Sequence, residues 1–405
     1  MSENKIPQNK NFEEPSMESN ASNNQEEVRS LRDLLDLVTG KSTDVSVTQD
    51  DSGVAEILPF PFLALVGQIE MKMALLLSIV NPNIGGVLLI GPRGTGKTTA
   101  VRSLLDLLPD VEHSKCFYGC LPEDVEQGGM FAICPECAKR YAAGGDLAVM
   151  EKVRLVELPL NAKLEDVIGG IDARGVVHER QKLKRGILAY ADKNVLFIDE
   201  VNILSNEIID AILDAAASGM YFVRRGSLSA NYRSRFTLIG SMNPEEGNLR
   251  PQIMDRFGLR VVIQGLSAPE ERLEAYHRVR RYKRNPFQTI TQYATETRLA
   301  RSEIEAARKL LPNVILTDEI ACLGINLIRQ LEIDSLRAEI TLFEAARAHA
   351  AVDSRSVVEI NDLRAVLPMA LRLRESDFMA KYMQDQNKEK RGLVDVMDNL
   401  IPEKE

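Results

Sequence analysis

The stretch that decides the fold is Gly86–Thr98, GVLLIGPRGTGKT. Its apolar half, residues 86–90, is typical of a short buried β-strand. The residues that follow fit the phosphate-loop pattern G-x-x-x-x-G-K-[ST], and a helical pattern continues from Thr99 to Leu108. Glycines let such a loop curl so that its backbone N–H groups face a phosphate, and the helix adds its positive N-terminal end. The sequence therefore predicts a nucleotide site between a strand and a helix.

A second apolar run, residues 194–198, ends in Asp199 and Glu200. Because the carboxyl ends of parallel strands meet at one edge of a sheet, both acids are expected beside the phosphate loop. Asp199 is expected to hold Mg²⁺ through water, and Glu200 to polarise the attacking water as a general base. A third run, residues 236–240, leads to Asn243, which could orient that water, although Asn-Pro is also a common turn pair.

Side-chain chemistry assigns the loop its roles. Lys97 can reach the β- and γ-phosphates of ATP, and Thr98 can hold Mg²⁺ together with Asp199. The predicted nucleotide-binding residues are Gly91, Pro92, Arg93, Gly94, Thr95, Gly96, Lys97, Thr98, Thr99 and Asp199.

Apolar strands alternate with helical stretches as far as residue 263, which predicts an α/β domain with a parallel sheet covered on both faces. After residue 267 the pattern is helical only, over 303–311, 318–331, 340–352 and 361–373. We therefore expect a disordered acidic extension with a short amphipathic helix (1–58), a nucleotide-binding domain (59–266), a helical lid domain (267–374) and an acidic tail (375–405).

The net charge of −9 is concentrated at the two ends of the chain. Residues 1–58 carry 12 acidic and 5 basic side chains, and residues 375–405 carry 8 and 5. The nearly neutral body between them argues against a protein that coats nucleic acid. Neither a membrane-spanning apolar run nor a signal sequence is visible, so we expect a cytoplasmic protein.

Four of the five cysteines lie within 22 residues, as Cys116-x3-Cys120 and Cys134-x2-Cys137. This spacing is typical of zinc ligands and predicts a four-thiolate site in a Cys-rich insertion at 113–141. Free reduced thiols, redox disulfides and an iron–sulfur cluster remain alternatives. Cys322 lies in an apolar helical stretch and is predicted to be part of the core.

These motifs resemble the AAA+ ATPases of the chelatase/MoxR branch, and most of all the ATPase subunit I of magnesium chelatase. The resemblance extends from Phe60 to about Leu373. It rests on Leu65–Gln68, Gly85–Val87, the loop 91–98, Ile198–Asn202, Ala216–Gly219, Gly240–Gly247, Leu249–Gln252, Asp255–Gly258 and Leu336-Arg337.

The resemblance implies a ring, usually of six subunits, with nucleotide at the subunit interfaces. Arg256 then matches the arginine finger and Arg337 matches sensor 2, although either guanidinium could pair with a local acid such as Asp255 or Glu339. Residues 158–192 resemble the helix-2 insert. Residues 220–235, with Arg224, Arg225, Arg233 and Arg235, resemble the hairpin before sensor 1, which could touch a protein partner or, less in keeping with the neutral body, nucleic acid.

By the same resemblance, the chain would work with an integrin-like D subunit and a porphyrin-binding H subunit. It would then drive insertion of Mg²⁺ into protoporphyrin IX for chlorophyll or bacteriochlorophyll synthesis. The competing hypotheses are a chelatase-like or MoxR-type ATPase that remodels another protein, and a nucleic-acid motor.

Overall fold

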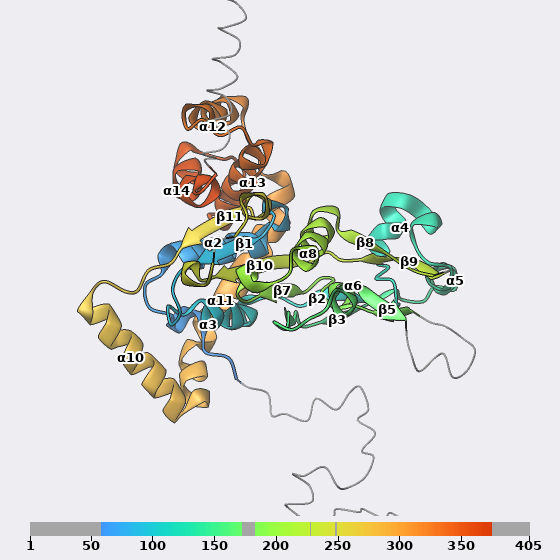
Figure 1. Cartoon of the computed structure of the whole chain (residues 1–405), viewed down its shortest axis with the longest axis horizontal. Coiled ribbons are helices and arrows are strands. Elements are labelled where there is room, and N and C mark those ends of the chain that lie inside the picture. Colours follow the sequence, from blue (N-terminus) through green and yellow to red (C-terminus); the bar gives the residue numbers. More distant parts are fainter. Residues whose placement is uncertain (1–57, 172–182, 227, 248, 375–405) are drawn as a thin grey trace, which may run out of the picture. The chain divides into compact units, whose positions relative to one another are not determined.

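The computed structural model describes residues 58–171, 183–226, 228–247 and 249–374 (Figure 1). These residues belong to one unit of the chain, which begins at Leu58. The predicted amphipathic helix of the N-terminal extension and the acidic tail at 375–405 lie outside the described residues.

Five parallel strands form the central sheet, in the order β11-β1-β10-β7-β4. Their bounds are β1 (Val87–Ile90), β4 (Leu155–Glu157), β7 (Val195–Ile198), β10 (Thr237–Met242) and β11 (Leu259–Val262). The predicted α/β class with a parallel sheet is confirmed. Ile90 at the end of β1 pairs with Met242 at the end of β10, so the polar residues after these strands meet at one edge.

The side chains of β1 alternate between two hydrophobic cores, one on each face of the sheet. Val87 and Leu89 pack in the core shared with α2 (Ile69–Val80) and α3 (Lys97–Ser103). Leu88 and Ile90 pack in the core shared with α8 (Asn206–Ser218). The helix expected at 99–108 begins at Lys97 and continues as the 3₁₀ turn η3 (Leu104–Leu107).

A group of helices follows β11: α10 (Pro269–Arg284), α11 (Pro286–Leu310), α12 (Asp318–Gln330), α13 (Leu336–Val352) and α14 (Ile360–Leu371). The helix α11 is much longer than the predicted 303–311. Its start is marked by Asn285, whose side chain accepts a hydrogen bond from the N–H of Gln288. Only Thr289, Ile304 and Ala307 of α11 are buried, so its N-terminal half shows little apolar periodicity.

The prediction for Cys322 is wrong, because this side chain is exposed on α12. The buried positions of α12 are Gly324 and Ile328, which lie four residues apart on one face. Cys322 is two residues from Gly324 and therefore points away from that face. The apolar composition of α12 did not show which of its faces packs against the rest of the protein.

Besides the central sheet, the described residues form three two-stranded antiparallel hairpins. The first, β2 (Val111–Ser114) with β3 (Ala148–Glu151), encloses α4 (Pro122–Gly128) and α5 (Pro135–Ala142). This Cys-rich insertion is therefore longer than the predicted 113–141, because cysteine spacing carries no information about the flanking strands. The others are β5 (Gly169–Ile171) with β6 (Leu183–Arg185), and β8 (Met220–Arg225) with β9 (Leu228–Arg233).

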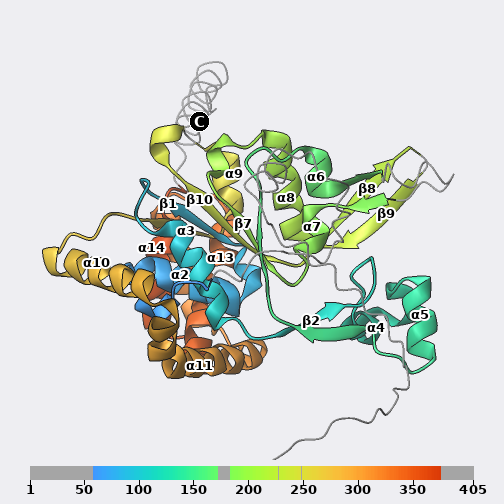
Figure 2. The same ribbon diagram turned by 90° about the horizontal axis from the view of Figure 1, so that it is seen from below.

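Figures 1 and 2 place α4, α5 and the β8–β9 hairpin on the same side of the molecule, away from α13 and α14. Of the helices in the described ranges, none is long and apolar enough to cross a membrane.

Candidate nucleotide-binding site

The phosphate loop connects β1 to α3 and has an open inner surface. Gly94 and Gly96 have φ angles of +79° and +86°, which side-chain-bearing residues rarely adopt. A Cβ added at either position would meet no atom within 4 Å. These two glycines are therefore required by the backbone conformation, and the space beside them is available to a ligand.

Lys97 is largely buried at the base of the loop, with 8% of its surface exposed. Its Nζ donates to the carbonyl oxygens of Gly91 at 2.6 Å and Pro92 at 2.8 Å. Burial lowers the pKa of the Lys97 ammonium, while the nearby carboxylates of Asp199 and Glu200 act in the opposite direction. The ammonium is thus held within the loop, at a position where it could pair with a bound phosphate.

A chain of hydrogen bonds connects the loop with the end of β7. The hydroxyl of Thr98 donates to Oδ2 of Asp199 at 3.2 Å, and Ser241 donates to the other carboxylate oxygen. The same Ser241 hydroxyl accepts from the N–H of Glu200 at 3.2 Å. Since Mg²⁺ prefers oxygen ligands, the paired oxygens of Thr98 and Asp199 fit a magnesium ion.

Glu200 occupies a strained backbone position, with a φ of +55°. Its carboxylate accepts a hydrogen bond from Nη2 of Arg93 at 3.1 Å, and Arg93 also pairs with Glu246. The loop itself therefore holds the predicted general base in place.

Asn243 lies at the same sheet edge and is 3% exposed. Its side-chain oxygen accepts from the N–H of Glu245 at 3.3 Å, and its carbonyl oxygen accepts from Asn202 at 3.3 Å. The residue thus caps the turn that follows β10, in agreement with the turn interpretation of Asn-Pro.

Two predicted site residues, Arg256 and Arg337, make no polar contact with the described residues of the phosphate loop. Arg256, at the end of α9 (Pro251–Arg256), pairs with Asp214 of α8 at 2.7 Å. Arg337, at the start of α13, pairs with Asp255 at 3.4 Å, which is one of the local acids considered above. Within the described part of the chain, neither guanidinium makes a hydrogen bond or ion pair with residues 91–99.

Sequence reasoning missed Ser241 and Glu246 as parts of the site. Both belong to the run Gly240–Gly247 after the third predicted strand, so their position next to Asn243 was an available signal. Their contacts with Asp199 and Arg93 depend on strand register, which the sequence alone does not give.

The sheet domain also has an open cavity of about 570 Å³, whose lining includes no residue of the phosphate loop. It is formed by the start of α2 and the chain after β11, and Gln68 closes one side by donating to the carbonyl oxygen of Gln264 at 2.7 Å. The chain after β11 also touches the loop, since a Cβ at Gly91 would lie 2.3 Å from the carbonyl oxygen of Ile263. Ile263 thus links Val262 and Gln264, which line the cavity, with Gly91 at the start of the loop.

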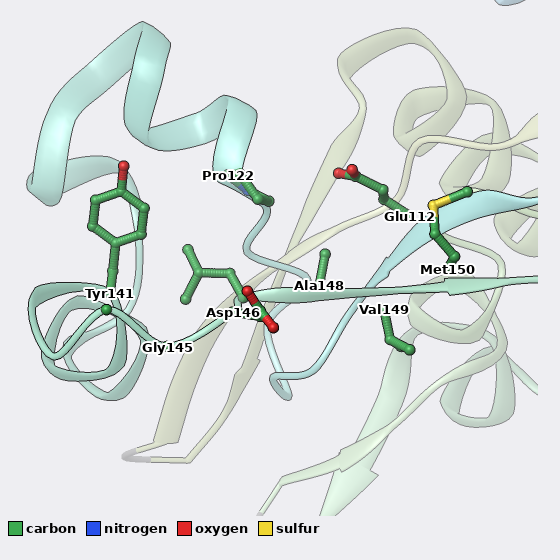
Figure 3. A pocket seen from close by; sticks show the side chains of 10 residues that line it. Glu112, Pro122, Tyr141, Gly145, Asp146, Ala148, Val149 and Met150 are labelled. Carbon is green, nitrogen blue, oxygen red and sulfur yellow. The ribbon is translucent and has the colours of Figure 1, made fainter.

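A second cavity of about 580 Å³ belongs to the Cys-rich insertion (Figure 3). Glu112 and Met150 of the paired strands β2 and β3 line one end of it, and Tyr141 of α5 lines the other. It includes no residue of the phosphate loop.

The four clustered cysteines come together in space. Their Sγ atoms all lie within 4.8 Å of one another, and all four are free thiols. Hydrogen bonds, first among them one from the Cys120 thiol, lower the pKa of Cys116 to about 3.

Two family profiles match the chain, "Magnesium chelatase, subunit ChlI" over residues 167–267 and "AAA lid domain" over residues 325–393. A "Magnesium-chelatase subunit ChlI homolog" from Methanocaldococcus jannaschii is 42% identical over 336 residues, which are 82% of this chain and 89% of that protein. The "Magnesium-chelatase 38 kDa subunit" of Acidiphilium rubrum is 42% identical over 317 residues, 78% of this chain and 90% of that protein.

Among solved structures, a chain from a complex between subunits BchI and BchD of magnesium chelatase is 37% identical, with a TM-score of 0.44. The match covers 78% of this chain and 96% of that one. On the strength of the relatives that share 42% identity over about four fifths of its length, the chain belongs to the magnesium-chelatase subunit ChlI family of AAA+ ATPases.

Proposed function

We propose that this chain is the ATP-hydrolysing motor subunit of a magnesium chelatase. The observation that carries the proposal is the hydrogen-bonded set of Thr98, Asp199, Ser241 and Glu200 beside an open phosphate loop. This set supplies a magnesium ligand pair and a candidate general base at the same sheet edge. Membership of the subunit ChlI family supports the chelatase part of the proposal.

ATP and Mg²⁺ are the proposed substrate and cofactor. Backbone N–H groups of residues 91–98 receive the phosphates, and Lys97 exchanges its carbonyl partners for phosphate oxygens. Mg²⁺, when bound, neutralises phosphate charge, with Thr98 and Asp199 as its protein-side partners. Glu200 leaves Arg93 to polarise the attacking water, which Asn243 helps to orient.

The cavity between the start of α2 and the chain after β11 is proposed to take the adenine base. Its lining residues Val262 and Gln264 flank Ile263, which lies against Gly91 at the start of the phosphate loop, and both polar and apolar groups line it. A purine needs an apolar face and a few backbone polar groups, which Ile69, Val262 and the backbone around Gln264 supply.

Arg256 is proposed to act on the nucleotide of a neighbouring copy in a ring, which would be a hexamer by family resemblance. Its exposed ion pair with Asp214 makes no contact with the loop of its own chain. Breaking such a surface ion pair costs little free energy, so Arg256 can leave Asp214 for another anion. Arg337 is proposed to leave Asp255 and to reach the nucleotide when the lid closes. An arginine suits both tasks, since it is always charged and donates two hydrogen bonds to a phosphate.

Subunits D and H complete the proposed enzyme, in which the H subunit binds protoporphyrin IX and this chain supplies the energy in the cytoplasm. Reconstitution of the purified chain with D and H subunits tests this role, with formation of magnesium protoporphyrin as the readout. We expect product only when ATP and all three subunits are present. ATP hydrolysis without any product in the complete mixture would overturn the chelatase role and leave the motor role intact.

A chelatase-like ATPase that remodels another protein is the second candidate. Two observations favour it: the relative from Methanocaldococcus jannaschii is named only as a homolog of subunit ChlI, and the chain carries the four-cysteine insertion. This function would be supported if a client protein other than the D and H subunits stimulated ATP hydrolysis by the chain.

A further inference from the structure

We propose that the four cysteines bind one zinc ion, and that this ion clamps the Cys-rich insertion onto the β5–β6 and β8–β9 hairpins. The inference does not depend on the proposed ATPase activity, since the phosphate loop contributes nothing to it.

The arrangement of sulfur atoms fits a tetrahedral zinc ion. A Zn–S distance of about 2.3 Å puts the four sulfurs roughly 3.8 Å apart. All four Sγ atoms already lie within 4.8 Å of one another, so a small side-chain adjustment completes the site. Iron–sulfur clusters spread their thiolates over separate iron atoms, which calls for a wider arrangement.

Backbone N–H groups point at three of the four sulfurs, as expected for thiolate ligands. The Sγ of Cys116 accepts from the N–H groups of Tyr118 and Cys120, both at 3.3 Å. The Sγ of Cys120 accepts from the N–H of Cys134 at 3.3 Å, and the Sγ of Cys134 accepts from Cys137 at 3.5 Å. Such hydrogen bonds stabilise the negative charge of metal-bound sulfur and orient the ligands.

The insertion has too small a core to fold on apolar contacts alone. Apart from two of the cysteines, its own cluster of buried hydrophobic residues contains only Ile133 and Leu147. Small elements of this kind are commonly held by a structural metal ion. A zinc ion at the sulfurs would tie the loop 116–120 to the start of α5.

The loop around Cys116 is also the surface by which the insertion contacts the β5–β6 hairpin. Nη2 of Arg185, on β6, donates to the carbonyl oxygen of Cys116 at 2.6 Å. Its guanidinium lies 4.4 Å from the centre of the Phe117 ring, which is within the range of a cation–π contact. Cys116, a proposed zinc ligand, and the adjacent Phe117 therefore both contact the β5–β6 hairpin.

The β8–β9 hairpin and the chain just after it contact the insertion through two arginines and a tyrosine. Arg233, the last residue of β9, pairs with Asp124 of α4 at 3.0 Å. Arg235, two residues after β9, donates to the carbonyl oxygen of Gly119 at 3.1 Å. The buried ring of Tyr232 lies 5.5 Å from that of Phe117. Two of the four arginines in residues 220–235 therefore contact the protein's own insertion, so the position of the hairpin depends on an ordered cysteine loop.

Metal analysis of the full-length protein tests the site. We expect about one zinc ion per chain in the wild type and in the control Cys322→Ser, whose thiol is exposed and distant in sequence. Cys116→Ser and Cys137→Ser should lose most of the zinc. Wild-type protein that contains no zinc, or that contains iron with sulfide, or that has two disulfides among these cysteines, would overturn the proposal.

Hydrogen exchange before and after zinc chelation tests whether zinc holds the insertion on the two hairpins. Because this experiment uses the wild-type protein, it does not depend on variants that could fail to fold. Chelation should speed amide exchange by about tenfold or more in residues 116–137, 183–185 and 220–233, and leave residues 87–90 and 195–198 unchanged. Added zinc should restore the slow exchange. Zinc release without faster exchange in the two hairpins would overturn the clamping role, whatever the ATPase activity of the protein.

Discussion

The guanidinium of Arg374 is fully buried and lies 2.6 Å from the carboxylate of Asp255. The same carboxylate lies 3.5 Å from buried Arg260 and 3.4 Å from Arg337 of α13. Asp255 is the residue before Arg256, so one acid connects the helix of the proposed arginine finger with the lid. Burial, first, and the charge of Arg374 lower the pKa of Arg260 to about 9, against the attraction of Asp255.

Asp255→Ala should destabilise the fold strongly, because two buried guanidinium groups lose their counter-charge. We expect a loss of about 3–5 kcal/mol in the free energy of unfolding. Chemical denaturation provides the measurement, with Asp214→Ala as the control. Asp214 is exposed and its ion pair with Arg256 lies at the surface, so its removal should cost less than about 1 kcal/mol. Equal stability of the two variants would contradict the role of Asp255.

Ser241→Ala should slow ATP hydrolysis about tenfold, because Asp199 and the backbone of Glu200 lose a shared hydrogen-bond partner. A positioning role also predicts that more Mg²⁺ is needed for half-maximal activity. The control is Ser218→Ala, whose hydroxyl only bonds backbone carbonyls at the end of α8. An unchanged Mg²⁺ requirement in Ser241→Ala would show that Ser241 does not act through Asp199.

Much of the site could be predicted because its information is local. The phosphate loop, Asp199 and Glu200 each follow an apolar strand directly, and parallel strands bring their carboxyl ends together. The contact between Arg93 and Glu200 joins residues 107 positions apart, and it follows only from the strand order. Cysteine spacing indicated a metal site in the same local way, but it carried no information about the docking of that site on Arg185.

The stability of the lid should fall at low pH because of Asp362, whose side chain is fully buried. Burial raises its pKa, but hydrogen bonds, first from Arg355 at 2.8 Å and also from the N–H of Glu359 at 2.7 Å, bring the pKa below its usual value. A pKa that is lower in the folded state contributes stability above the unfolded value of about 3.9, and this stability is lost as pH falls through the folded pKa.

Thermal unfolding between about pH 3 and pH 7 measures this contribution. Asp362→Asn should lower the melting temperature at neutral pH and flatten its decline below about pH 4. Asp353→Asn is the matched control, since Asp353 also pairs with Arg355 but is half exposed. If both variants decline in acid as steeply as the wild type, Asp362 is not the group responsible.

Arg256→Ala should still bind ATP and should hydrolyse it roughly 10³-fold more slowly, by analogy with other arginine fingers. Glu200→Gln should also bind ATP without turnover, because the general base is lost while the hydrogen-bonding shape is kept. Each variant alone is thus expected to be inactive for a different reason.

The most direct test of the account is ATP hydrolysis by an equimolar mixture of Arg256→Ala and Glu200→Gln. If Arg256 serves the nucleotide of the neighbouring copy, mixed rings contain interfaces with an intact Glu200 and an intact Arg256. The account predicts that mixing restores a clear fraction of the wild-type rate. A mixture as inactive as its two components, or Arg256→Ala at the wild-type rate, would contradict it.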